Sequence, residues 1–418
     1  LPDDPNLSLQ RGRIHEFFKY TKPHRKLLEQ IELVIIDEIS MVRADIIDAI
    51  DRILRVYSHN LREPFGGKQL LLVGDVFQLE PVVKNDEREI LNRFYPTPYF
   101  FSARVFGQID LVSIELQKVY RQTDPVFVGV LDHIRNNTAG AADLQLLNTR
   151  YGSQIEESEA DMYITLATRR DTVDSINEKK LAELPGDPIT FEGVIEGDFP
   201  ESSLPTSQEL VLKPGAQIIF IKNDFDRRWV NGTIGVIAGI DEEEETIYVI
   251  TDDGKECDVK RESWRNIRYR YNEKTKEIEE EVLGSFTQYP IRLAWAITVH
   301  KSQGLTFSRV VIDFTGGVFA GGQAYVALSR CTSLDGIQLK KPINRADVFV
   351  RPEIVNFAGR FNDRQAIDKA LKQAQADVQY AAASRAFDKG DMEECLEQFF
   401  RAIHSRYDIA VSYTHLRA

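Results

Sequence analysis

Acidic and amide side chains follow two short apolar runs in this sequence. The run at 33–36 continues into Asp37 and Glu38, and the run at 70–73 is soon followed by Gln78. Mg²⁺ prefers one or two carboxylates together with water and phosphate oxygens, so the acid pair suits a magnesium nucleotide. Asp37 would then hold the ion, Glu38 would polarise an attacking water, and Gln78 would detect a terminal phosphate through its amide. The alternative is an ordinary turn after each core strand.

Two arginines, Arg121 in LQKVYRQTD and Arg330 in YVALSRCTS, each stand at the end of an apolar stretch. An arginine can neutralise the charge that develops in phosphoryl transfer, an effect of roughly 10³–10⁵ in rate. Its planar, forked guanidinium also matches phosphate better than a lysine ammonium does. Taken singly, each arginine is more typical of an ion pair on the surface.

The stretch TVHKSQGLTFSRVVID, residues 298–313, has the most specific pattern in the chain. His300, Lys301 and Ser302 bring polar groups and backbone amides that could hold the phosphates of DNA. Gln303 and Gly304 would face a nucleotide. The alternative is the start of a helix that is rich in polar capping residues.

The elements that must position these side chains are typical of parallel α/β sheets. Continuous apolar strands at 33–36 and 70–73 predict burial on both faces, and apolar residues at helical spacing between 46 and 57 predict a helix that joins them. The carboxyl ends of such strands form the ligand-binding edge of an open α/β sheet. A second α/β region is expected to include strands at 162–168 and 310–313.

Between these last two strands the pattern changes to short β-rich runs. Residues 216–221, 233–240 and 246–251 are separated by Asn-Gly and Asp-Gly turn signals. This pattern predicts a small all-β barrel, from about residue 210 to residue 283, inserted into the second α/β domain.

From about residue 363 the chain is rich in alanine and is predicted to be helical. The segment KGDMEECLEQFFRAI, residues 389–403, resembles the second half of a tetratricopeptide repeat, but one repeat cannot bury its face alone. Two interpretations follow: an array that was cut off, or a plain helical hairpin. This tail is also the expected contact with a protein partner. Residues 411–418 resemble translated adapter sequence and the chain lacks an initiator Met, so we expect a reading frame clipped at both ends.

Composition limits the class of protein. The net charge is −13, which disfavours a nonspecific nucleic-acid coat but allows a locally basic channel. The three cysteines lack CxxC spacing, so we expect neither a disulfide framework nor a structural zinc, and a reducing cytoplasmic setting. No apolar run reaches the length of about 18 residues that suggests a membrane helix, and we expect no contact with a membrane.

Six motifs in a fixed order carry a resemblance to a known family. DEISM, GDVFQLEPV, YRQTD, WVNGTIG, AWAITVHKSQG and AYVALSRCTS occur between about residues 33 and 350. In this order they resemble superfamily-one DNA helicases of the Pif-one and RecD-like group. The resemblance implies two RecA-like domains that clasp ATP and Mg²⁺, the first one incomplete here, with a Src-homology-3-like barrel inserted in the second. It also implies ATP-driven movement on single-stranded and forked DNA, 5′ to 3′, in repair, recombination or replication.

The resemblance also implies roles for single residues. Asp37 and Glu38 bind magnesium and activate water, and Gln78 senses the γ-phosphate. Arg121 and Arg330 are the arginine fingers of the second domain. Gln303 and Gly304 are expected to contact the nucleotide. His300, Lys301 and Ser302 are expected to contact the DNA strand.

Domain boundaries follow from the motifs and the changes in pattern. The first RecA-like domain is expected to end near residue 110, and the second to be split by the barrel. The expected ranges are 1–110 (first RecA-like domain), 111–209 and 285–352 (second RecA-like domain), 210–284 (barrel), 353–410 (helical tail) and 411–418 (non-native tail).

The sequence departs from the family in one important respect. It contains no G-x-x-x-x-G-K-[ST] phosphate-binding loop, since GGKQ at 66–69 lacks both the spacing and the hydroxyl. We therefore expect this chain to be inactive by itself as an ATPase. Two alternatives to a helicase remain: a DNA-binding scaffold without ATPase activity, or a RecD-like motor subunit of a nuclease complex.

Overall fold

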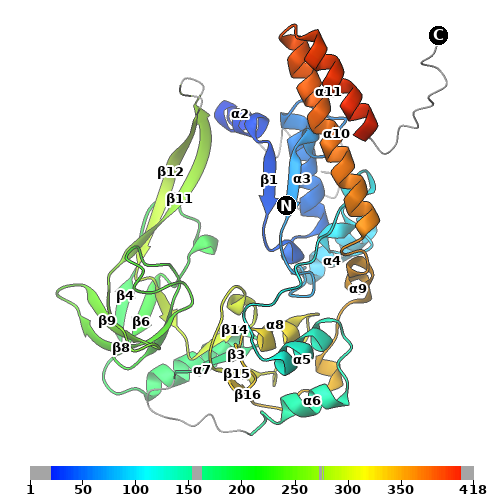
Figure 1. Ribbon diagram of the computed structural model, residues 1–418. Coiled ribbons are helices and arrows are strands. Elements are labelled where there is room, and N and C mark those ends of the chain that lie inside the picture. Colours follow the sequence, from blue (N-terminus) through cyan, green and yellow to red (C-terminus); the bar gives the residue numbers. More distant parts are fainter. Residues whose placement is uncertain (1–19, 153–161, 273–274, 276, 406–418) are drawn as a thin grey trace, which may run out of the picture. The chain divides into compact units, whose positions relative to one another are not determined.

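The computed structural model describes residues 20–152, 162–272, 275 and 277–405 (Figure 1). It divides into two compact units, and each is described by itself. The larger unit comprises residues 1–108 and 119–354, and the smaller one residues 109–118 and 355–418. The predicted tail at 411–418 lies outside the described residues. None of the described helices has the length and apolarity that a membrane crossing requires.

The first α/β domain of the larger unit contains the parallel strands β1 (Leu33–Ile36) and β2 (Gln69–Leu72). They are joined by α3 (Ala44–Tyr57), which confirms the helix predicted from apolar spacing. Helices α2 (Lys22–Gln30) and α4 (Asn85–Phe94) complete the set of longer elements described in this domain. Because β1 and β2 run in the same direction, the segments that carry the acids leave the sheet at one edge.

The prediction that these strands are buried on both faces is wrong. The side chains of Leu33, Ile35, Leu71 and Val73 are 44%, 59%, 47% and 44% exposed, and exposure alternates along both strands. Alternating side chains of a strand point to opposite faces of the sheet. One face of the β1–β2 pair is therefore not covered by any element within the described residues.

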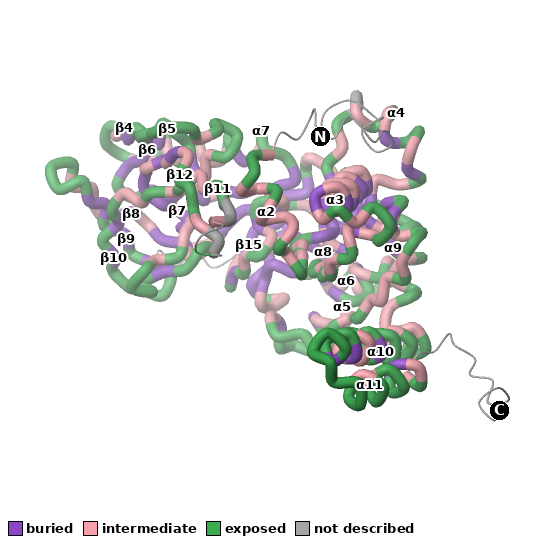
Figure 2. The backbone as a smooth tube through the Cα atoms, turned by 90° about the horizontal axis from the view of Figure 1, so that it is seen from above, coloured by how far each residue is buried: buried purple, intermediate pink, exposed green. Residues whose placement is uncertain are grey.

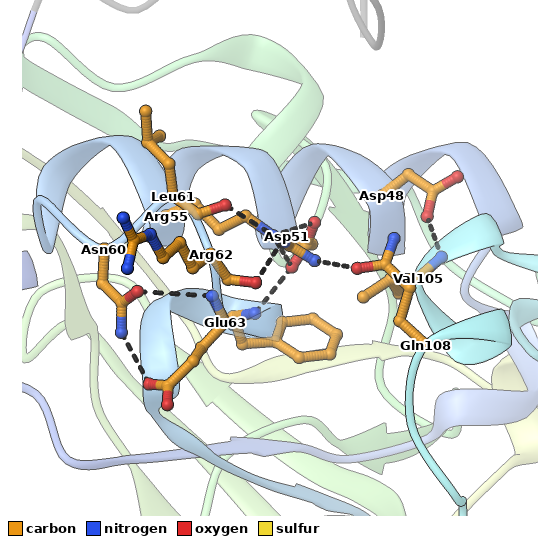
Figure 3. Close-up of polar contacts among 10 residues, drawn as sticks. Asp48, Asp51, Arg55, Asn60, Leu61, Arg62, Glu63, Val105 and Gln108 are labelled. Atoms are coloured by element: carbon orange, nitrogen blue, oxygen red, sulfur yellow. Dashed lines mark hydrogen bonds and ion pairs between the residues drawn. The ribbon is translucent and has the colours of Figure 1, made fainter.

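A buried ion pair attaches α3 to the segments around it (Figure 3). The Arg55 Nε donates to both carboxylate oxygens of Asp51 at 2.8 Å, and the Phe65 amide donates to Asp51 Oδ1 at 2.6 Å. Arg55 also donates to the Gln108 side chain at 2.8 Å and to the Leu61 carbonyl at 3.2 Å. These bonds fix the loop that leads from α3 into β2.

A second buried acid on α3 fixes the end of this domain. Asp48 accepts hydrogen bonds from the Tyr95 hydroxyl at 2.9 Å and from the backbone amides of Arg104 and Val105 at 3.1 and 3.0 Å (Figure 3 shows the bond to Val105). These bonds join α3 to the segment that ends the domain. The two buried acids of α3 thus have structural roles.

The second α/β domain is built on a four-stranded parallel sheet in the order β14-β3-β15-β16. The strands predicted at 162–168 and 310–313 are confirmed as β3 and β15, whose residues are all buried. Four helices of this domain are described along the chain. The elements are β3 (Ile164–Ala167), β14 (Ala296–Thr298), β15 (Val310–Asp313), β16 (Ile337–Leu339), α5 (Pro125–Arg135), α6 (Ala141–Asn148), α7 (Arg170–Glu183) and α8 (Gln323–Ser329).

The inserted region is all-β, as its turn signals predict. A five-stranded antiparallel sheet has the order β10-β9-β8-β7-β13, and a long ribbon of β11 and β12 continues through β5. The ribbon and the sheets use residues on both sides of the predicted range 210–284. The Src-homology-3-like class of this insert stays a prediction. The strands are β4 (Ile189–Glu192), β5 (Val194–Gly197), β6 (Glu209–Leu212), β7 (Gln217–Phe220), β8 (Ile234–Asp241), β9 (Thr246–Thr251), β10 (Glu256–Val259), β11 (Glu262–Asn272), β12 (Glu277–Gln288) and β13 (Ile291–Leu293).

Helices dominate the smaller unit, as predicted for the tail. Helix α10 (Arg364–Asp388) packs against α11 (Met392–Ser405), and α9 (Pro352–Ala358) precedes them. Ala376, Ala383 and Ala402 are buried, whereas most of the hairpin is exposed, as Figure 2 shows. Small residues let the two helices approach closely. The two interpretations of this tail, a repeat array or a plain hairpin, stay open.

Candidate functional site

The two acids of the first motif stand on a strained turn directly after β1. Glu38 has a left-handed backbone with φ of 49°, which is uncommon for a residue with a side chain. Its amide donates to Asp37 Oδ1 at 2.8 Å, and both acids are exposed. The turn lies against the one that follows β2, because the Ile39 amide donates to the Val73 carbonyl at 3.0 Å and a Cβ at Gly74 would lie 2.9 Å from the Ile39 nitrogen. The glycine therefore permits the close approach.

Gln78, the predicted phosphate sensor, lies in the loop that begins at Asp75. The Phe77 amide donates to Asp75 Oδ1 at 3.0 Å, and the Gln78 side-chain amide donates to Asp75 Oδ2 at 3.4 Å. Gln78 is half-buried. Asp75 thus holds the loop and orients the amide of Gln78 at the same edge as the acids.

This loop is joined to the second α/β domain through Asp75. The Arg135 Nε lies 3.7 Å from Asp75 Oδ1, and the Arg135 guanidinium lies over the Phe77 ring at 4.4 Å. Burial, and then the charge and hydrogen bond of Asp75, raise the pKa of the Tyr325 hydroxyl. Two residues of the second domain, on α5 and α8, therefore contact the loop that carries Gln78.

The contact between the loop that carries Gln78 and the second α/β domain requires a glycine at the start of α8. Gly322 has φ of +78°, and a Cβ there would overlap the carbonyl oxygens of Phe77 and Gln78. Farther along the loop, Glu80 accepts from the Tyr99 hydroxyl at 2.8 Å and pairs with Arg351 at 3.3 Å. The backbone of the sensor loop is consequently in direct contact with the second domain.

Arg330, one predicted arginine finger, is buried at 1% exposure with no carboxylate in ion-pair distance among the described residues. Its guanidinium donates to the Val326 carbonyl at 3.1 Å and to the Ser329 hydroxyl at 3.2 Å. Burial first, and then the charge of Arg121, lower the pKa of Arg330 to about 10. Glu38 and Asp75 raise this pKa, so both acids of the first domain lie within electrostatic reach of the guanidinium.

Arg121, the other predicted finger, contacts the end of α8. Its Nε donates to the Thr306 hydroxyl at 2.9 Å and its Nη1 to the Ser329 carbonyl at 3.1 Å. The neighbouring Gln122 is buried and donates to the carbonyls of Ser329 and Cys331 at 2.9 and 2.8 Å. Burial lowers the pKa of Arg121. The structure thus brings both arginines together at the carboxyl end of α8.

The residues of the TVHKSQG motif follow β14 and occupy different environments. His300 is half-buried, Lys301 is exposed, and Ser302 is buried with its hydroxyl donating to the Val299 carbonyl at 2.7 Å. Burial lowers the pKa of His300, which favours its neutral form. The hydroxyl of Ser302 therefore serves the turn itself, and a contact between Ser302 and DNA stays a prediction.

Gln303 and Gly304 follow at the same turn. The Gln303 side-chain nitrogen is buried and has no hydrogen-bond partner within the described residues. Gly304 has φ of +76° and is exposed. An unpartnered buried donor is costly, so a ligand that accepts a hydrogen bond there would be favoured.

These observations test whether ATP and Mg²⁺ suit the site. A buried guanidinium without a carboxylate is costly to maintain and would be compensated by an anionic ligand. The orphaned amide of Gln303 needs an acceptor, and the exposed Asp37 is the kind of ligand that Mg²⁺ takes together with phosphate oxygens. The chemistry of these groups fits a magnesium nucleotide.

The sequence alone missed the residues that join the two domains. Asp75 and Tyr325 each lie within one of the motifs, but neither position indicated that the two contact each other. Arg135 ends an ordinary amphipathic helix and has no motif around it. Only the three-dimensional arrangement assigns these three residues to one cluster.

Comparisons with known proteins agree with this arrangement. Residues 14–134 match the family model described as PIF1-like helicase. The chain is 33% identical to the ATP-dependent DNA helicase Pif1 of Campylobacter jejuni over 329 residues, 75% of this chain and 70% of that protein. It is 34% identical to the human ATP-dependent DNA helicase PIF1 over 312 residues, which cover 73% of this chain but only 45% of the human protein.

Solved structures of Pif1 helicases are also similar to this chain. The crystal structure of Pif1 from a Bacteroides species in complex with ADP-AlF4 is 39% identical and has a TM-score of 0.77, covering 86% of this chain and 81% of that one. A structure of Bacteroides Pif1 bound to single-stranded DNA has a TM-score of 0.61 at 39% identity, covering 84% and 80% of the two chains.

Fold and site together define a class: two RecA-like α/β domains, with acids at the edge of one sheet and arginines contributed by the other domain. This is the P-loop NTPase architecture of superfamily-one helicases. The chain belongs to the family of PIF1-like helicases.

Proposed function

We propose that this chain is the greater part of an ATP-dependent DNA helicase that moves on single-stranded DNA and unwinds forked duplexes. The observation that carries the proposal is the position of Arg330. This buried cation of the second domain has no carboxylate partner among the described residues, yet it lies within reach of Glu38 and Asp75 of the first domain. Such an arrangement suits a phosphate group bound between the two domains.

Each residue of the site has a role in this proposal. When bound, ATP with Mg²⁺ supplies the phosphoryl group whose transfer releases free energy. Asp37 holds the ion, Glu38 accepts a proton from the attacking water, and Gln78 contacts the terminal phosphate. Arg121 and Arg330 neutralise the charge that develops, and Gln303 and Gly304 face the nucleotide.

The contacts of the Asp75 loop with the second α/β domain can transmit a change at the nucleotide to the segment that binds DNA. A change at Gln78 alters the contacts of its loop with Arg135, Tyr325 and the start of α8. Arg330 directly follows α8, and its guanidinium donates to the Ser302 carbonyl at 3.5 Å. Such a change therefore reaches the segment of His300, Lys301 and Ser302, which is proposed to follow the DNA strand. The direction of movement, 5′ to 3′, is proposed from the family resemblance.

The helical tail is proposed to bind a protein partner in the cytoplasm. Leu396, Phe399 and Phe400 on α11 are 51%, 42% and 51% exposed, and their spacing of three and four residues places them on one face of the helix. This exposure supports a docking role.

The experiment that tests the proposal restores the missing phosphate-binding loop. The chain is joined to an N-terminal segment that carries G-x-x-x-x-G-K-[ST] from a PIF1-like helicase, and ATP hydrolysis is measured with and without single-stranded DNA. We expect hydrolysis that DNA stimulates, and its loss in Glu38→Gln with DNA binding retained.

A DNA-binding scaffold without ATPase activity is the second candidate, and the same experiment separates it from a helicase. If the extended chain binds DNA but hydrolyses no ATP, the helicase proposal is wrong and the scaffold is supported. Co-purification of a stable nuclease would instead support the RecD-like subunit.

A further inference from the structure

Three parallel strands of the second domain deliver polar and aromatic residues to one edge of the sheet. Strand β3 lies between β14 and β15, with Thr298 of β14 and Asp313 of β15 both paired to Ala167 at its end. The chain then continues into Arg170 after β3, into Lys301 after β14, and into Phe319 after β15. Segments far apart in the sequence therefore emerge side by side at this edge, which is where open α/β sheets bind ligands.

An aromatic platform stands at this edge. The rings of His300 and Phe319 are nearly parallel, with an interplanar angle of 17° and centroids 6.5 Å apart. Phe319 is nevertheless 55% exposed. Its backbone amide donates to the side chain of Gln323 at 3.2 Å, and Gln323 is completely buried, so the loop that carries Phe319 is anchored to α8. The backbone that carries the ring is held, and the ring offers part of its surface to a ligand.

A group of three cations lies beside this platform. Strands β14 and β3 pair at Thr298 and Ala167, so Lys301 and Arg170, each about three residues farther along, leave the sheet beside each other. Arg292 lies on β13, which directly precedes β14, and donates to the carbonyl of Pro205. Burial first, and then the charges of Arg292 and Arg170, lower the pKa of Lys301. Asp174 pairs with Arg170 at 3.5 Å, and it is the carboxylate that offsets the repulsion at Lys301 within the described residues. Like charges held together favour a bound anion.

We propose that Phe319 stacks on a base of single-stranded DNA while Arg170, Arg292 and Lys301 bind an adjacent phosphate. The inference rests on the proposed function and adds Phe319, Arg170 and Arg292 to the residues that contact the strand. Aromatic rings and cationic grooves are the two features by which proteins hold single strands without reading sequence. The site therefore accepts any base.

The first test removes the ring. Binding of a fluorescent oligothymidylate to the full chain is measured by anisotropy without nucleotide. Phe319→Ala is expected to weaken binding by about 5- to 140-fold, the range found for loss of one base–aromatic stack, and Phe319→Trp is expected to restore it. Phe387→Ala is the matched control, since Phe387 is similarly exposed (60%) but lies on α10; its affinity should be unchanged.

The second test removes one charge and measures salt dependence. For single strands the slope of log K against log salt changes by about 0.7 for each phosphate contact that is lost. Arg170→Ala should reduce the slope by this amount, whereas Phe319→Ala should leave the slope unchanged. Lys179→Ala is the control, because Lys179 also forms an i,i+4 ion pair on α7, with Glu183 at 3.9 Å.

The outcomes separate this inference from the proposed function. If the unaltered chain binds the oligonucleotide but both variants bind as it does, with the same slope, the assignment of Phe319 and Arg170 is overturned and the helicase proposal stands. If the unaltered chain binds no single-stranded DNA, both are overturned. Circular dichroism of each variant shows that it is folded.

Discussion

Replacing Arg330 by Met should separate stability from function. Burial lowers the pKa of Arg330 to about 10, so the folded state carries this charge at a cost of about 3 kcal/mol at neutral pH. Met removes the charge and fills a similar volume. It also removes the bonds to Val326 and Ser329 and two longer ones to the carbonyls of Ser302 and Leu305, at up to about 1 kcal/mol each. We therefore expect a net change in stability between a loss and a gain of about 1 kcal/mol.

A second buried arginine serves as the control. Arg55 is 8% exposed and pairs with Asp51 at 2.8 Å (Figure 3). Arg55→Met leaves that carboxylate buried without its cation, which typically costs about 3–5 kcal/mol. The same chemical change should thus cost far more stability at Arg55 than at Arg330, because only one of the two guanidiniums has a carboxylate partner.

Native-state hydrogen exchange with mass spectrometry reads the two sites separately, since each helix opens with its own free energy. In Arg55→Met, peptides of α3 should exchange roughly a hundred to a few thousand times faster. In Arg330→Met, peptides of α8 should exchange within about fivefold of their rate in the unaltered chain. If α8 loses as much protection as α3 does, Arg330 is an ordinary structural cation and the reasoning about the site is wrong.

Three further predictions concern the joint, the pH dependence and the missing loop. Gly322→Ala should displace the carbonyls of Phe77 and Gln78 and speed hydrogen exchange in the sensor loop; unchanged exchange there would contradict the contact. Burial lowers the pKa of His300 in the folded state, so its contribution to stability is complete above about pH 6.5 and is lost as the pH falls. The unfolding midpoint of His300→Gln should therefore change less between pH 7 and pH 5 than that of the unaltered chain. The same pH dependence in both proteins would contradict this. The chain without a phosphate-binding loop should show no DNA-stimulated ATP hydrolysis in a coupled assay, and measurable turnover would refute that expectation.

Local periodicity was sufficient to predict individual elements. The spacing of apolar residues in α3 and the continuous apolar runs of β3 and β15 depend on neighbours along the chain, so their type could be read from the sequence. The burial of β1 could not, because the coverage of a strand depends on which elements lie over it. Leu33 and Ile35 have the composition of a buried strand and are nevertheless exposed.

The same distinction applies to the site. Asp37, Gln78 and Arg330 stand in motifs whose spacing is visible in the sequence. The contact between Asp75 and Arg135 joins residues 60 positions apart, the difference between 135 and 75, through packing of two domains. The cations around Lys301 likewise come from three separate segments. Such clusters depend on tertiary structure, and no local pattern indicates them.

Unwinding is the measurement that tests the central claim most directly. The chain is extended by a segment with the phosphate-binding loop, and is given ATP and duplexes that carry a single-stranded tail at the 5′ or the 3′ end. The account predicts strand separation that requires ATP, that is faster with the 5′ tail, and that is lost in the Arg330→Met variant. ATP-independent binding of both substrates, with no strand separation by a folded protein, would contradict it.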